Sequence, residues 1–266
     1  MFVIILFLIL FGLVIGSFLH VLIYRTVHDE SYVTGRSKCP HCKKLIHWYD
    51  NIPMISFFLL SGMCRTCKKP ISWDYPAIEM MTAGLFVWWY LIGFTFFRLS
   101  TQPFSLLQPA FWLFVGVCLI SIFFADLLYG IIPDSVLTVL TGLGLLYRIM
   151  LYMFHVMRPV DFWLTLAGAT VSSLMFLGLW IATKKRGMGL GDVKFVFPLG
   201  LILGWPNMFV GLFLSFVIGT VTGVALIAFK KKKFRQTVPF GPFLVVGSVI
   251  TLVFGDKILQ WYLSFL

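Results

Sequence analysis

Two aspartates beside apolar segments are the side chains in this sequence most able to do chemistry. Asp192 ends the run Gly187-Met-Gly-Leu-Gly-Asp192, and Asp126 follows the apolar run Ile122-Phe-Phe-Ala125. A carboxylate at the mouth of a membrane helix is costly unless it has a partner or a task. Three glycines in five residues also allow positive φ angles and the close approach of another chain. Asp126 is therefore the first candidate partner for Asp192.

Two carboxylates on separate helices suggest three chemistries. A proton or cation pathway would use them as relay groups or ligands, whereas a metal site would normally need a histidine or a third carboxylate beside them. In an aspartic hydrolase, one ionised carboxylate takes a proton from water while the other, protonated, polarises the scissile carbonyl. The sequence supplies no Ser-His or Cys-His system instead. These residues alone support a protease and a transporter about equally well.

Four cysteines form a second group, Cys39-Pro-His-Cys42 and Cys64-Arg-Thr-Cys67. Two CxxC pairs at this separation can place four thiolates around one tetrahedral zinc ion, usually a structural site. Two disulfides or a redox-active motif are the alternatives. A cytoplasmic location argues against disulfides, and the absence of a βαβ pattern argues against a redox motif. A zinc-bearing, non-enzymatic membrane assembly protein is a third overall hypothesis.

The elements that position these residues are membrane helices. Of the 266 residues, 60% are hydrophobic and 12% charged, which is typical of a polytopic membrane protein. We predict an all-α fold with about eight transmembrane helices and a small zinc-binding domain inserted after the first. The first run is too long to be a removable signal peptide. The expected apolar segments are 1–24, 76–97, 107–128, 131–156, 160–182, 193–204, 206–229 and 239–264, of which 193–204 is short and interrupted by Pro198.

The basic residues indicate the orientation and three domains. All but Arg98, Arg148, Arg158 and Lys257 of the 21 lysines and arginines fall on one predicted side, which the positive-inside rule makes cytoplasmic. The net charge of +11 therefore reflects topology, and we expect no nucleic-acid partner. The expected domains are the first transmembrane helix (1–24), a cytoplasmic cysteine domain (25–74) and a membrane domain with both aspartates (75–266).

Motifs along nearly the whole chain resemble those of the bacterial type IV prepilin leader peptidases. The similarity includes Gly16-Ser-Phe18 with Arg25, both cysteine pairs, Ile46-His-Trp-Tyr-Asp-Asn-Ile-Pro53, Ile71-Ser-Trp-Asp-Tyr-Pro-Ala-Ile-Glu79, Asp126 with Ile132-Pro-Asp134, and Gly189-Leu-Gly-Asp-Val-Lys194. The resemblance implies an aspartic protease of the bacterial inner membrane that cuts the basic leader from prepilins or pseudopilins on the cytoplasmic side. It also implies methylation of the new N-terminus with S-adenosylmethionine.

The resemblance further implies roles for single residues. Asp126 and Asp192 match the catalytic aspartates, and Cys39, Cys42, Cys64 and Cys67 match zinc ligands of a domain tied to methylation. On physical grounds rather than by resemblance, Gly189 and Gly191 would let an extended peptide approach Asp192. Lys194 would contact the headgroup region, orient the loop or favour the ionised form of Asp192. His20 stands where the family usually has asparagine, and Asp50 and Glu79 are weak candidates for the methyltransferase.

Overall fold

The computed structural model describes residues 1–28, 30–31, 35–99, 103–184, 187–229 and 238–265. Helices make up the regular structure of these residues, apart from two isolated β-bridges. The chain divides into two compact units, Met1–Ser121 and Ile122–Leu266. The basic residues Lys185, Arg186, Lys230–Lys233 and Arg235, which we used for orientation, lie outside the described residues.

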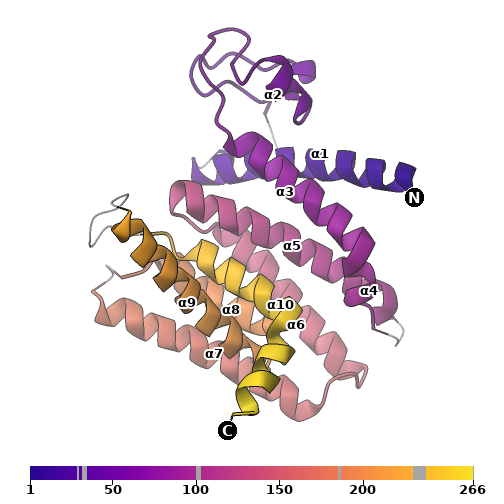
Figure 1. Ribbon diagram of the computed structural model, residues 1–266, viewed down its shortest axis with the longest axis vertical. Helices are drawn as coiled ribbons and strands as arrows, with labels where there is room; N and C mark the ends of the chain where they lie inside the picture. The colour runs from indigo at the N-terminus through magenta and orange to yellow at the C-terminus, as the bar shows by residue number, and fades with distance from the viewer. Residues whose placement is uncertain (29, 32–34, 100–102, 185–186, 230–237, 266) are drawn as a thin grey trace. The chain divides into compact units, whose positions relative to one another are not determined.

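All eight expected apolar segments are helical (Figure 1). Seven are long and apolar enough to cross a membrane, while the short segment near 193–204 forms the 14-residue helix α8. The all-α prediction is thereby confirmed. The long helices are α1 (Phe2–Val27), α3 to α4 (Asp74–Phe96, with a π-helical turn at Trp89–Gly93), α5 (Phe104–Tyr129), α6 (Asp134–Met153), α7 (Pro159–Ala182), α9 (Asn207–Ala228) and α10 (Gly241–Leu263).

In the first unit, α1 and α3 (Asp74–Trp88) pack side by side. Two glycines of α1 allow this approach: a Cβ on Gly12 would lie 2.6 Å from Cα of Ala83, and one on Gly16 would lie 2.6 Å from Cα of Glu79. Small residues at a helix contact let two backbones come close, which is how membrane helices gain packing energy. This contact positions Glu79 beside Gly16, in the C-terminal half of α1.

In the second unit, α8 (Leu190–Leu203) is the central helix. It packs against α6, α7, α9 and α10, and nine of its 14 residues are buried, among them Asp192. Gly200 of α8 meets Ala169 of α7 so closely that an added Cβ would lie 2.8 Å from the alanine Cα. The C-terminal residues Leu201 and Ile202 are buried, so water cannot satisfy the carbonyls at that end of the helix.

Arg148 of α6 satisfies the C-terminal end of α8. Its Nε donates to the Leu201 carbonyl at 2.6 Å, and its second terminal nitrogen donates to the Ile202 carbonyl at 2.8 Å. A cation at the C-terminus of a helix also interacts favourably with the helix dipole. Arg148, which the charge pattern places on the outer side, therefore holds α8 in place.

We expect Arg148→Met to destabilise the protein by about 2 kcal/mol or more, because two buried carbonyls lose their donors. Thermal unfolding in detergent, followed by tryptophan fluorescence, should show a clearly lower midpoint. The matched control is Arg158→Met, which removes an exposed arginine paired with Asp161 and should change the midpoint little. Equal midpoints for the two variants would contradict this role of Arg148.

Candidate functional site

Asp192 lies in the first turn of α8, three residues after the N-terminal cap Gly189. Its Oδ2 accepts a hydrogen bond from the Gly189 backbone N–H at 3.0 Å, which is half of a capping box. The residue is only 5% exposed. Its other oxygen, Oδ1, is buried and has no hydrogen-bond partner among the described residues. An unpartnered buried carboxylate oxygen is costly and requires an explanation.

Asp126 lies near the C-terminal end of α5 and is also 5% exposed. Its Oδ2 accepts a hydrogen bond of 2.8 Å from the backbone N–H of Gly241, the first residue of α10. A Cβ on residue 241 would lie 2.6 Å from this same oxygen. Only glycine therefore lets the start of α10 come this close to the carboxylate.

The structure brings Asp126 and Asp192 near enough for their carboxylates to interact electrostatically. Each carboxylate also accepts a backbone N–H at the start of a helix, where the helix dipole favours negative charge. Like charges held close in a buried site cannot both be ionised easily, so such a pair tends to share a proton. The arrangement can thus present one acid and one base at the same place.

The glycine-rich loop works differently from our expectation of positive φ angles. Gly189 has φ −75° and ψ 152°, and the described glycines with positive φ are Gly35, Gly62, Gly130 and Gly204. Gly191 instead provides room, since an added Cβ would lie 3.1 Å from Cβ of Ile132. Small size in the first turn of α8, rather than an unusual backbone angle, is what this position requires.

Lys194 forms an ion pair with Asp134, its Nζ lying 2.8 Å from one carboxylate oxygen. Asp134 is the first residue of α6, so the pair joins the starts of α6 and α8. Of the three roles considered for Lys194, orienting the loop agrees with this contact.

The four cysteines Cys39, Cys42, Cys64 and Cys67 form one cluster in the first unit. Their sulfur atoms all lie within 4.8 Å of one another, and those of Cys39 and Cys67 are 3.9 Å apart. Around a tetrahedral zinc ion with Zn–S bonds of about 2.3 Å, the sulfurs would be about 3.8 Å apart. None of the five cysteines, all of them described, is in a disulfide. The donor set and its spacing fit a metal ion such as zinc.

The two cysteine pairs lie in matching turns, residues 37–46 and 62–71. Cys39 N–H donates to the Lys44 carbonyl and Lys43 N–H to the Cys39 carbonyl, and Cys64 makes the same two bonds with Lys69 and Lys68. Lys43 and Lys68 both adopt positive φ, 57° and 55°. The same turn therefore presents each cysteine pair, and the two turns form two halves of one candidate metal site.

Of the two acidic methyltransferase candidates, Asp50 already has a partner. Arg65, inside the second cysteine pair, contacts both of its carboxylate oxygens at 2.6–3.0 Å. This arginine lowers the pKa of Asp50 below its usual value and connects Asp50 to the turn that carries Cys64 and Cys67. Glu79 is buried and accepts a hydrogen bond from the Met54 N–H at 2.7 Å.

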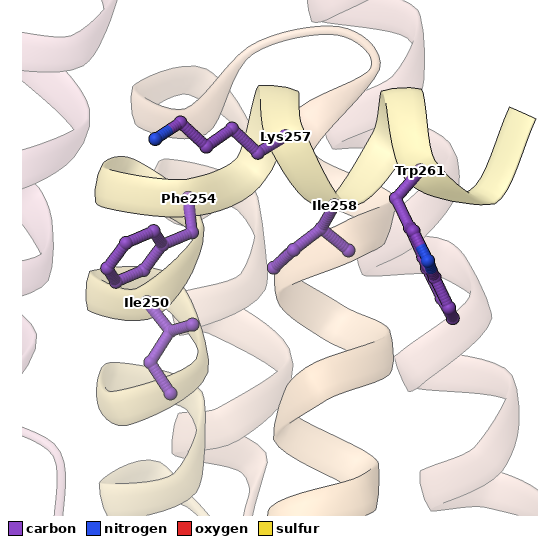
Figure 2. A pocket seen from close by; sticks show the side chains of 5 residues that line it. All are labelled: Ile250, Phe254, Lys257, Ile258 and Trp261. Atoms are coloured by element: carbon purple, nitrogen blue, oxygen red, sulfur yellow. The ribbon is translucent and has the colours of Figure 1, made fainter. Parts of the chain in front are cut away.

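A shallow hollow on α10 carries no candidate chemistry. Figure 2 shows that Ile250, Phe254, Lys257, Ile258 and Trp261 line it, all from this one helix. Aromatic rings and a lysine near the end of a membrane helix are typical of the membrane interface.

Comparison with known proteins gives one consistent result. Residues 10–92 match the model of the bacterial peptidase A24 N-terminal domain, and residues 113–224 match that of the type IV leader peptidase family. The chain belongs to the type IV leader peptidase family. Its relatives named prepilin leader peptidase/N-methyltransferase include proteins of Legionella pneumophila (32% identical, covering 96% of this chain and 93% of the relative), Aeromonas hydrophila (31%, 96% and 92%) and Bacillus subtilis (29%, 96% and 96%). No solved structure matches significantly.

Membership in the leader peptidase family makes the chain an endopeptidase, and both aspartates lie in the matched peptidase region. Gly241, which holds Asp126, lies beyond that region and was not among our candidates. Its only signal is Gly241-Pro242 at the start of an apolar run, a common helix beginning.

We expect the purified protein to hold about one zinc ion per chain, because four cysteines fill one tetrahedral shell. Cys64→Ser should lose this metal, as measured by elemental analysis. The matched control is Cys118→Ser, which changes the one cysteine outside the cluster and should keep the zinc. A wild-type protein without metal, or a Cys64→Ser protein that retains it, would contradict the assignment.

Proposed function

We propose that this enzyme removes the short basic leader of type IV prepilins or pseudopilins at the cytoplasmic membrane face. Asp126 and Asp192 are the catalytic pair. The main support is the buried, electrostatically coupled pair of carboxylates, each held by a backbone N–H. The names of the relatives support the substrate class. The distribution of basic residues supports the orientation.

In the proposed reaction, the pair shares one proton. The ionised carboxylate takes a proton from water, which attacks the scissile carbonyl, while the protonated carboxyl donates a hydrogen bond to the carbonyl oxygen. Asp192 Oδ1 has no other described partner, so it is available to carry the shared proton or to hold the water. The hydrogen bonds from Gly189 and Gly241 fix the other oxygen of each carboxylate.

The enzyme then methylates the new N-terminal residue of the product with S-adenosylmethionine. The relatives' names include this second activity, and the methyl donor supplies the transferred methyl group. The residues 25–74 form the zinc-stabilised cytoplasmic domain associated with methylation, after the first transmembrane helix (1–24). The membrane peptidase domain comprises residues 75–266. The protein acts in the inner membrane of a bacterium.

We expect Asp126→Asn and Asp192→Asn each to reduce leader removal by about 100-fold or more, because each loses one half of the acid–base pair. The measurement is cleavage of a prepilin in membranes, followed by its change in mass. Asp161→Asn is the control, since Asp161 lies in the first turn of α7 and pairs with Arg158. Normal cleavage by either variant of the pair would exclude it from catalysis.

Gly241→Ala should also reduce cleavage by about 100-fold, since its methyl group would push the Asp126 carboxylate from its place and small misplacements are costly. Gly142→Ala is the matched control in the same unit, because nothing lies within 4 Å of a Cβ at that position. Equal cleavage rates for the two glycine variants would show that the α10 contact does not position Asp126.

A further inference from the structure

The first unit contains a cavity of about 870 Å³. The C-terminal half of α1, the first turns of α3 and the loops around the cysteine pairs form its walls, and Val21, Tyr75 and Glu79 are among the residues that line it. Cavities of this size commonly hold cofactor-sized ligands. Neither Asp126 nor Asp192 is part of its lining, so the peptidase reaction does not account for the cavity.

Glu79 is the unusual group in this wall. It lies in the second turn of α3 and is 6% exposed, and no ion pair joins it to a described lysine, arginine or histidine. Its Oε2 accepts the Met54 N–H at 2.7 Å. A buried carboxylate without a cation beside it is costly in a membrane helix and usually has a function. Its chemistry suits a ligand with a positive charge.

The loop that Glu79 holds is strained. Met54 has φ 59° and ψ −53°, and the Ile55 N–H donates to the Pro53 carbonyl at 2.6 Å across it. This is a γ-turn of the rare, positive-φ type. Strained residues persist where surrounding contacts enforce them, and they are concentrated at ligand sites. Glu79 supplies one such contact. It therefore shapes the cavity wall and also gives the wall a negative charge.

We propose that this cavity binds S-adenosylmethionine, and that Glu79 binds the amine that receives the methyl group. The proposal rests on the proposed function and gives its methylating half a site. Tyr24, Phe57 and Tyr75 border the cavity, and aromatic side chains of this kind pack against a purine ring. Tyr24 and Tyr75 already stack on His28 and His20. Arg36, Lys38 and Lys69 also border it, and cations of this kind pair with a carboxylate such as that of the donor's methionine part.

Glu79 has a defined task in the transfer. The N-terminal ammonium of the cleaved product gives one proton to the Glu79 carboxylate, which frees the nitrogen lone pair. The nitrogen then forms its bond to the methyl carbon while the carbon–sulfur bond of the donor breaks and its electron pair stays on sulfur. The products are a protonated N-methyl amine and a neutral thioether, so charge and atoms balance.

The test separates donor binding from methylation. Binding of radiolabelled S-adenosylmethionine is measured by equilibrium dialysis without prepilin, and cleavage and methylation are measured by mass spectrometry of a prepilin. Val21→Trp fills the cavity from α1, and Lys69→Trp fills it from the cysteine loops. Both should bind the donor at least tenfold more weakly and still cleave. Should one of them fail to accumulate, the other provides the same test.

Glu79→Gln keeps an acceptor for the Met54 N–H but removes the negative charge. It should bind the donor within about threefold of wild type and cleave normally, yet lose methylation by about 100-fold, as expected for loss of a general base. Asp74→Asn is its matched control, since Asp74 lies on the same helix outside the lining, and it should retain all three activities.

Unchanged donor binding in the filling variants that still cleave would overturn the cavity as the site. Normal methylation by Glu79→Gln would overturn the role of its carboxylate. A wild-type protein that cleaves but neither binds the donor nor methylates would instead refute the methylating half of the proposed function, and the site with it.

Discussion

The second unit depends on how the short helix α8 is buried. Its C-terminal end is buried, so water cannot satisfy the last carbonyls and Arg148 donates to two of them. At its exposed start, Asp192 accepts the Gly189 N–H. The same carboxylate interacts electrostatically with Asp126. One side chain thus caps the helix and is also a member of the proposed catalytic pair.

The first unit depends on another source of folding energy. Between α1 and α3 the chain has few buried apolar side chains, Cys39 among them, so packing alone supplies little folding energy. Two matching turns place four sulfurs within reach of one metal ion, and binding of that ion would contribute directly to folding. The walls of the Glu79 cavity include these turns, so a structural metal would also shape the proposed donor site.

Much of the fold and part of the candidate site could be predicted from the sequence, because apolar length and CxxC spacing are local signals. The membrane helices and the cysteine cluster were predicted in this way. The pairing of Asp126 with Asp192 was instead expected from the predicted membrane face and from the family resemblance, and it stays a prediction. Contacts between distant segments left no such signal. The Gly241 N–H on Asp126 and the Arg148 cap on α8 join positions more than 50 residues apart. The φ angles of the Gly187–Gly191 loop were also not predictable, since glycine permits both signs.

The central claim is that Asp126 and Asp192 act as one pair with a single shared proton. The most direct test is the rate of leader removal by the wild-type enzyme as a function of pH, with saturating prepilin in membranes that remain intact throughout. The account predicts a bell-shaped profile, because one carboxyl must be ionised and the other protonated. A rate that rises with pH to a plateau, with no loss at the basic side, would contradict it.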